Sequence, residues 1–314
     1  MITEHDALTP IERHRGRLYK RDDLFAPFGD VPLSGGKVRQ AMRLLGSARE
    51  RIVTEHGGVV LTTTGVHSPQ GLIIARVCRE LGLRCVIFVG ATTVGGALSR
   101  HAMLRHALAA GAQIDARARV AYEPVLMRAA KDWRDEHDGA GYVVRFGINL
   151  EDDPDAIIGS TAEQLRNVPS SVREIVVPTG AGITAAGVIL GAAEYAPHAR
   201  ITVVQIAGYD RTELIGRVVG AHDYDYVALR GVPYARMLTR QLAPSVWLDP
   251  IYEAKAHDWL LEHRAAHDDR VLFWLVGDST AVRAHDMKAP GRVVVGATRR
   301  RQRVARQPAS ARVG

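Results

Sequence analysis

The feature that most constrains the fold is a regular alternation of strand and helix patterns between residues 59 and 137. Short apolar runs rich in β-branched residues lie at 59–64 and 84–90, and each is followed by a stretch in which apolar residues recur at helical spacing. A short strand at 113–115 precedes another helical stretch at 122–137. Strands joined by helices pair in parallel, so the pattern predicts an α/β fold with parallel-rich sheets flanked by helices.

The remaining segments are assigned by the same criteria. Strands are expected at 174–178, 200–206 and 271–277, and helices at 37–55, 97–110, 155–166, after 183 and up to about 263. Residues 1–32 read as irregular, with short extended pieces and turns at several prolines, and residues 210–245 read as less regular than the rest.

The length of 314 residues suggests about two domains. We expect residues 48–145 to form a small α/β domain inserted into a discontinuous large domain made of residues 1–47 and 146–288. Residues 289–314 would form a tail.

The composition is that of an ordinary globular protein, with 46% hydrophobic and 24% charged residues. No apolar run of about 18 residues predicts a membrane span, and the polar, acidic N-terminus does not read as a secretory signal. Cys78 and Cys85 lie in apolar patterns, which favours buried thiols over a disulfide or a metal site. A cytoplasmic location is expected.

The net charge of +7 is unevenly distributed. From Met287 onward there are eight basic residues and no acid, so subtracting them leaves about −1 for residues 1–286. We expect the basic segment 289–314 to be a solvated, disordered tail. Binding of nucleic acid or of another acidic surface by this tail is the alternative.

The first candidate site is Lys37 in the run L-S-G-G-K-V-R-Q at 33–40. Gly35 and Gly36 permit a tight backbone and close approach by a ligand. At a helix start, the dipole and neighbouring cations favour a neutral amine, which is a nucleophile for carbonyls and can form a Schiff base. The alternative is a solvated loop lysine. The spacing does not match a nucleotide P-loop.

The second candidate site is the glycine-rich turn T-G-A-G-I-T, which joins a buried strand to a helix. Backbone N–H groups at the start of the helix and two threonine hydroxyls would suit a phosphate. The spacing does not fit a dinucleotide-binding turn, because position 185 is alanine. The turn comprises Thr179, Gly180, Ala181, Gly182, Ile183 and Thr184.

L-Y-K-R-D-D-L at 18–24, the Lys37 run and D-P-I-Y-E-A-K at 249–255 together resemble a known family. It is the 1-aminocyclopropane-1-carboxylate deaminase and D-cysteine desulfhydrase family of tryptophan synthase β-like enzymes. The resemblance covers about residues 15–280. It implies a two-domain, fold type II architecture, pyridoxal 5′-phosphate (PLP) as cofactor and a homodimer.

The resemblance also implies roles for individual residues. Lys37 would carry PLP, and residues 179–184 would bind its phosphate. Glu253 would contact the pyridine nitrogen and make the ring a strong electron sink, and Tyr252 would be a general acid or base near the reacting carbon. In the loop at 65–71, Ser68 and Gln70 would face the substrate carboxylate and the ring hydroxyl of PLP. His67 is either a proton carrier or a solvated loop residue.

Several positions depart from the family pattern. Gly36 and Pro69 replace asparagines, and Pro69 removes a side-chain donor and a backbone N–H. Arg230 replaces a tyrosine that usually precedes the V-P pair, which argues against plain ring opening of aminocyclopropane carboxylate. Arg230 would either bind a second anionic group of a larger substrate or lie on the surface.

The expected function is that of a PLP-dependent lyase or deaminase acting on a small-molecule amino acid, with Lys37 also serving as the base at the α-carbon. One alternative is a PLP enzyme that modifies an amino acid attached to nucleic acid, which the basic tail would help to bind. Another is a catalytically inactive binding protein on the same fold.

Overall fold

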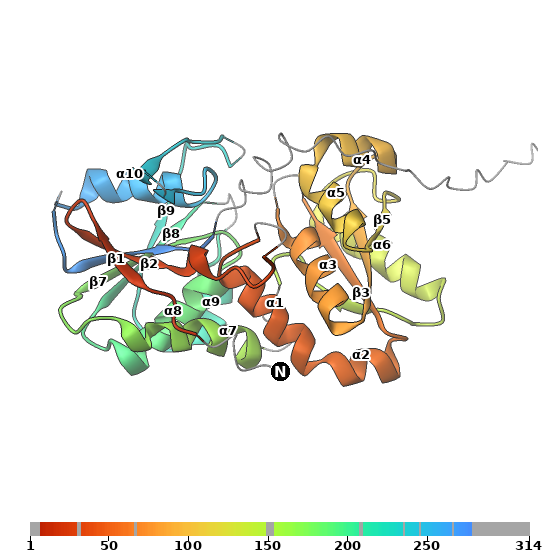
Figure 1. Cartoon of the computed structure of the whole chain (residues 1–314), viewed down its shortest axis with the longest axis horizontal. Helices are drawn as coiled ribbons and strands as arrows, with labels where there is room; N and C mark the ends of the chain where they lie inside the picture. Colours follow the sequence, from red (N-terminus) through yellow and green to blue (C-terminus); the bar gives the residue numbers. More distant parts are fainter. Residues whose placement is uncertain are drawn as a thin grey trace, which may run out of the picture.

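The computed structural model describes residues 7–29, 33–65, 68–148, 154–206, 210–234, 236–244, 246–265 and 267–277. Within these ranges the chain forms two main sheets flanked by helices and a third, two-stranded sheet. Helix α1 (Gly36–Ser47) lies between the two halves (Figure 1). The expected α/β architecture with parallel-rich sheets is confirmed.

The larger sheet has six strands in the order β1-β2-β12-β7-β8-β9. The β1–β2 hairpin is antiparallel and the other neighbours are parallel. Helices α8 and α9 pack on one face and α10 on the other. The bounds are β1 Ile11–His14, β2 Arg17–Arg21, β7 Glu174–Thr179, β8 Arg200–Gln205, β9 Asp225–Ala228, β12 Val271–Leu275, α8 Ile183–Tyr195, α9 Thr212–Val219 and α10 Glu253–His263.

The smaller sheet has four parallel strands in the order β5-β4-β3-β6. Helices α1, α3 and α5 cover one face, and α6 covers the other. The bounds are β3 Val59–Thr64, β4 Arg84–Val89, β5 Gln113–Asp115, β6 Tyr142–Val144, α3 Gln70–Leu81, α5 Ala102–Ala109 and α6 Glu123–Asp135. The other elements are α2 Arg49–Glu55, α4 Val94–Arg100, α7 Pro154–Ala162, β10 Gln241–Ala243, β11 Val246–Trp247 and two short 3₁₀ turns at Asp22–Leu24 and Glu163–Asn167.

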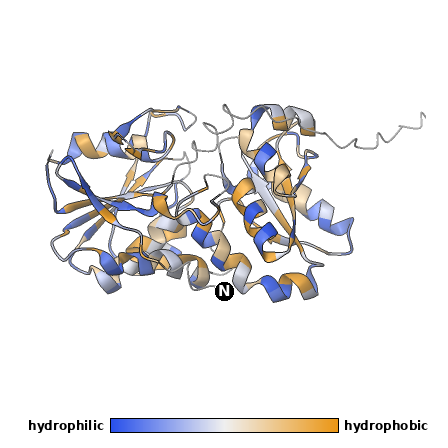
Figure 2. Cartoon of the chain, viewed as in Figure 1, coloured by the Kyte–Doolittle hydropathy of each residue, from blue (hydrophilic) through white to orange (hydrophobic). Residues whose placement is uncertain are grey.

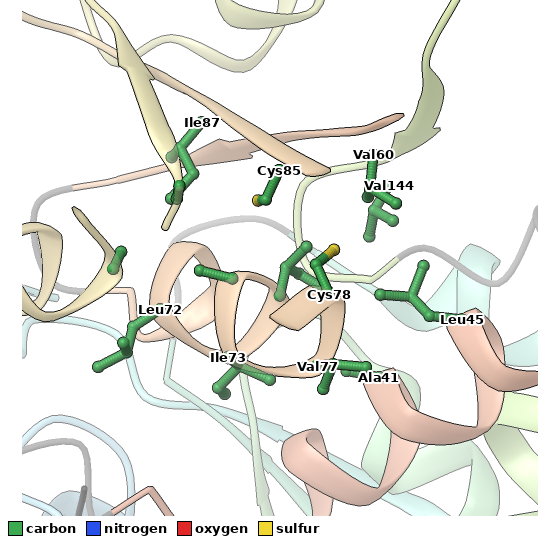
Figure 3. Packing of buried hydrophobic residues seen from close by; sticks show 14 of the residues in the cluster. Ala41, Leu45, Val60, Leu72, Ile73, Val77, Cys78, Cys85, Ile87 and Val144 are labelled. Carbon is green, nitrogen blue, oxygen red and sulfur yellow. The ribbon is translucent and has the colours of Figure 1, made fainter. Parts of the chain in front are cut away.

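The core of the smaller sheet is built around α3. Its apolar stripe, which includes Ile73 and Val77, contacts α1 below and the strands above (Figure 3). Figure 2 shows the same division, with hydrophobic strands inside and hydrophilic residues on the outer sides of the helices. Cys78 and Cys85 are buried free thiols, as expected.

Two of the helices predicted from the sequence are each divided into two shorter helices in the structure. The helix expected at 37–55 breaks at Ala48, just after Gly46 and Ser47, which are poor helix formers. The helix expected at 97–110 breaks at His101, whose backbone is extended. There the Arg105 guanidinium donates to Leu98 O at 2.8 Å and satisfies a carbonyl that the break leaves without its helical partner.

The segments that read as irregular also contain regular structure. Residues 210–245 include α9, β9 and β10, and the first 32 residues contain the β1–β2 hairpin. Every residue of β2 is buried although three of its five residues are basic. Lys20 donates to Thr9 O and Asn167 Oδ1, both at 2.8 Å, and Arg17 donates to Arg264 O at 3.0 Å at the end of α10.

The predicted domain division stays a prediction. The smaller sheet draws its strands from residues 59–144, which fits the proposed insert, but α1 and α7 residues share its hydrophobic cluster. No helix in the described part of the chain is long and apolar enough to cross a membrane. The predicted tail at 289–314 lies outside the described residues.

His257 on α10 predicts a pH dependence of stability. It is buried, its Nε2 lies 3.0 Å from the Tyr19 hydroxyl, and burial, with Arg17 nearby, lowers its pKa from 6.5 to about 4. The native state therefore binds fewer protons than the unfolded state, so this group lowers the unfolding free energy as the pH falls from 6.5 to 4, by about 3 kcal/mol in full.

Chemical denaturation between pH 7.5 and 4 tests this. His257→Gln should lose that component of the pH dependence, whereas His263→Gln, an exposed histidine on the same helix, should keep the wild-type profile. Equal profiles for wild type and His257→Gln would contradict the assignment.

Candidate active site

A cavity lies where strands of both sheets end. The segments that follow the carboxyl ends of β3, β6, β7 and β12 all contribute to its wall, which is the usual position of a ligand site in open α/β sheets. Of the residues singled out in the sequence, those that line it are Lys37, Ser68, Pro69, Thr179, Gly180, Ala181, Gly182, Ile183, Thr184 and Tyr252.

Lys37 enters the cavity from the first turn of α1. Gly35 precedes this turn with φ +99°, and its N–H donates to Phe25 O at 2.9 Å. Burial lowers the pKa of Lys37 from 10.5 to about 8. The neutral amine expected from the sequence is therefore more populated than in an ordinary lysine, through loss of hydration rather than through the helix dipole or neighbouring cations.

The 179–184 turn forms the start of α8. Gly182 has φ +93°, and its N–H donates to Thr179 Oγ1 at 3.1 Å, which closes the turn. Thr184 Oγ1 accepts from Gln40 Nε2 at 3.3 Å. The first N–H groups of a helix have no partner within it, so the start of this 13-residue helix presents donors to the cavity. This donor set fits a phosphate.

Ser68 and Pro69 form the cavity wall at the start of α3. Ser68 Oγ accepts from Gln70 N at 3.3 Å, and Pro69 occupies the position just before the helix. The beginning of α3 thus lies at the same cavity as the start of α8, and its N–H groups would suit a carboxylate. His67 lies outside the described residues.

Gln70 is buried and is not among the residues that line the cavity. Its Nε2 donates to Thr62 Oγ1 at 3.1 Å and to Arg145 O at 2.7 Å, and its Oε1 accepts from Gly147 N at 2.7 Å. The amide therefore connects α3 to β3 and to the loop after β6. Its predicted contact with a ligand stays a prediction.

We expect Gln70→Leu to lower the unfolding free energy by about 1–3 kcal/mol, because it removes the acceptor of the buried Gly147 N–H. Thermal or urea unfolding measures this. Gln113→Leu, at an exposed position of the same sheet, should change stability by less than about 0.5 kcal/mol. Unchanged stability combined with weaker cofactor binding would instead support the ligand role.

Tyr252 packs against the glycine-rich turn. A Cβ on Gly180 would stand 2.6 Å from Tyr252 Cε1, so the phenol ring occupies the space that a side chain at 180 would need. The Tyr252 hydroxyl lies 2.8 Å from the Tyr234 hydroxyl. Burial raises the pKa of Tyr252 well above 10 and keeps it protonated at neutral pH.

Glu253 is buried directly behind this wall. Its Oε2 accepts from Asp249 N at 2.8 Å and its Oε1 accepts from Gly277 N at 2.9 Å, and both Asp249 and Gly277 line the cavity. Burial, with Asp249 nearby, raises the pKa of Glu253 well above 4.5. The carboxyl holds the two wall segments together, and its contact with a ring nitrogen stays a prediction.

Arg230 lies away from this cavity. It is exposed and lines a separate surface groove together with Arg236, Arg240 and Lys255. The structure therefore does not bring Arg230 together with Lys37 and Tyr252.

Three further residues at the site were not singled out from the sequence. Gln40 lines the cavity three residues after Lys37, and this helical spacing could have indicated it. Asp249 lies inside the D-P-I-Y-E-A-K motif, and its Oδ1 accepts from Ile251 N and Tyr252 N at 2.9 and 2.7 Å. Tyr234 had no signal, because its segment read as irregular.

Solved structures of related shape support the fold. The chain resembles an ACC deaminase homologue with TM-score 0.70 and 21% identity, covering 90% of this chain and 94% of that one. It resembles the processed form of threonine deaminase isoform 2 from Solanum lycopersicum (TM-score 0.58, 15% identity, 90% and 83% covered). Maize serine racemase gives TM-score 0.60 and 17% identity, with 90% and 93% covered. At these identities the likeness shows the fold alone.

The sequence comparison decides the family. No protein with a curated description matches the chain. The family model described as pyridoxal-phosphate dependent enzyme matches residues 3–234, which include Lys37 and the 179–184 turn. The chain therefore belongs to the pyridoxal-phosphate dependent enzyme family, of fold type II, and its cofactor is PLP.

Proposed function

We propose that this protein is a PLP-dependent lyase or deaminase that acts at the α- and β-carbons of a small amino acid. The observation that carries the proposal is the placement of Lys37, with a pKa of about 8, in the same cavity as the phosphate-type turn of α8 and the protonated phenol of Tyr252. We further propose a cytoplasmic homodimer, for which the resemblance to the deaminase family is the support.

The described residues fit the cofactor. Lys37 would bind its aldehyde carbon, and residues 179–184 would hold its phosphate, since the turn offers helix N–H groups and a cavity wall free of bulky side chains at Gly180 and Gly182. Glu253 is our candidate for the group beside the pyridine nitrogen. When bound, PLP supplies an electron sink for the bonds at the substrate α-carbon.

The chain's own groups then divide the proton transfers. The neutral Nζ of Lys37 takes the proton from the substrate α-carbon, because a pKa near 8 leaves about one amine in ten unprotonated at pH 7, far more than in an ordinary lysine. The Tyr252 hydroxyl stays protonated at neutral pH, and it donates this proton to the leaving group or to the β-carbon of the substrate. The beginning of α3, with Ser68, binds the substrate carboxylate.

The test is a panel of L- and D-amino acids incubated with the PLP-loaded full chain in D₂O and followed by NMR. Exchange of the α-proton together with release of a 2-oxo acid and ammonium supports the proposal. Exchange with appearance of the opposite enantiomer and no 2-oxo acid would replace it with a racemase. No exchange with any member of the panel would overturn it and favour a binding protein.

A further inference from the structure

We propose that Lys255 and Tyr234 are positioning residues that hold the hydroxyl of Tyr252 in place at the cavity wall. Lys255 would fix the 233–234 turn, and Tyr234 would hold the Tyr252 hydroxyl through the hydrogen bond between the two phenols. The consequence for catalysis rests on the proposed function, whereas the hydrogen-bonded arrangement itself does not.

Lys255 is a buried part of α10 with defined contacts. It is 2% exposed, and its Nζ donates to Pro233 O at 3.0 Å and to Tyr234 O at 2.7 Å. A buried ammonium that donates to two carbonyls restrains the turn that carries them, because a movement of the turn would leave the buried ammonium without these acceptors. The position of Tyr234 therefore depends on Lys255.

The two phenols meet at the cavity wall. Their hydroxyl oxygens are 2.8 Å apart and their rings pack edge to face, with centroids 5.9 Å apart. Tyr252 lines the cavity, whereas Tyr234 lies behind it and does not. The hydrogen bond and the ring contact together restrain the Tyr252 hydroxyl.

The surroundings hold this pair of phenols together. The Lys255 ammonium lies 5.8 Å from the centre of the Tyr234 ring, so the side chain that fixes the 233–234 turn also contacts this ring. Burial, with Tyr234 and Asp249 nearby, raises the pKa of Tyr252 well above 10, so Tyr252 takes part in the hydrogen bond as a neutral phenol.

This arrangement separates two steps of the proposed reaction. Lys37 takes the α-proton without help from Tyr252, whereas proton delivery by Tyr252 needs its hydroxyl in place. Loss of Lys255 or Tyr234 should therefore leave α-proton exchange nearly intact and slow only the later release of product.

The first test needs neither cofactor nor substrate. 3-Fluorotyrosine is placed at position 252 of the full chain, and its ¹⁹F resonance is recorded for the wild-type background, Tyr234→Phe, Lys255→Met and Arg236→Gln. We expect the resonance to shift in Tyr234→Phe and Lys255→Met. It should stay in place in Arg236→Gln, which removes an exposed cation from the same groove. An unshifted resonance in Tyr234→Phe overturns the proposal even if the reaction is as proposed.

The second test uses the PLP-loaded protein. Tyr234→Phe and Lys255→Met should each lower the rate of 2-oxo acid release by about 10- to 100-fold and change α-proton exchange by less than about twofold. In a Tyr252→Phe background neither should have a further effect. Full additivity in that background, or a parallel loss of exchange, would show a merely structural role and overturn the proposal. If no variant and no wild-type protein releases a 2-oxo acid, the proposed function fails while the ¹⁹F result still decides the arrangement.

Discussion

Lys37→Ala should lose covalent attachment of PLP and at least about a thousandfold of any α-proton exchange, because the side chain both binds the aldehyde and takes the proton. Because the pKa of Lys37 is near 8, the rate of attachment should also depend on pH. At pH 7.5 roughly a quarter of such amines are neutral, against about one in a thousand for a lysine with pKa 10.5. The rate of attachment in the wild type should therefore rise with pH and level off above pH 8.

Absorbance in the visible range and mass spectrometry after borohydride reduction measure the attachment. Lys20→Met is the matched control, because burial also lowers the pKa of Lys20 to about 8 but its Nζ is bound to Thr9 and Asn167 outside the cavity. That variant should keep the visible band. A band that survives in Lys37→Ala, or a reduced adduct mapped to another lysine, would contradict the assignment of Lys37.

The parts of the site that could be predicted from the sequence are those set by local backbone. Lys37 follows two glycines at a helix start, and the 179–184 turn joins a strand to a helix, so a few neighbouring residues decide both shapes. The surroundings of Gln70 and Glu253 depend on distant residues instead. Gln70 contacts Gly147 and Glu253 contacts Gly277, and no local pattern predicts such pairs.

The same distinction explains the fold. Strands such as β3 and β7 were predictable because each contains a run of consecutive apolar, mostly β-branched residues. The basic strand β2 was not, because its burial depends on partners supplied by α10, by Thr9 and by Asn167. Charge in a sequence signals exposure only where no distant acceptor is available to pair with it.

Among the substitutions that add one methyl group near the site, Gly35→Ala should lower the unfolding free energy most. Gly35 adopts φ +99° and ψ 174°, a conformation that L-residues rarely adopt. An added Cβ would also stand closer than 3.0 Å to Val276 O, Val276 C and Gly277 Cα, where the chain after β12 crosses the start of α1. Backbone strain and a backbone clash together should cost more than about 4 kcal/mol.

The matched control is Gly46→Ala near the other end of α1, where an added Cβ meets nothing within 4 Å. That change should stabilise the protein by about 0.5–1 kcal/mol, because alanine loses less backbone freedom on folding than glycine does. Urea denaturation compares the two variants. If Gly35→Ala folds with near wild-type stability, the segment after β12 and the start of α1 must have moved apart, and Lys37 must have moved with the start of α1. Attachment of PLP should then fail in a stable protein, whereas intact stability and intact attachment together would show that this crossing does not position the lysine.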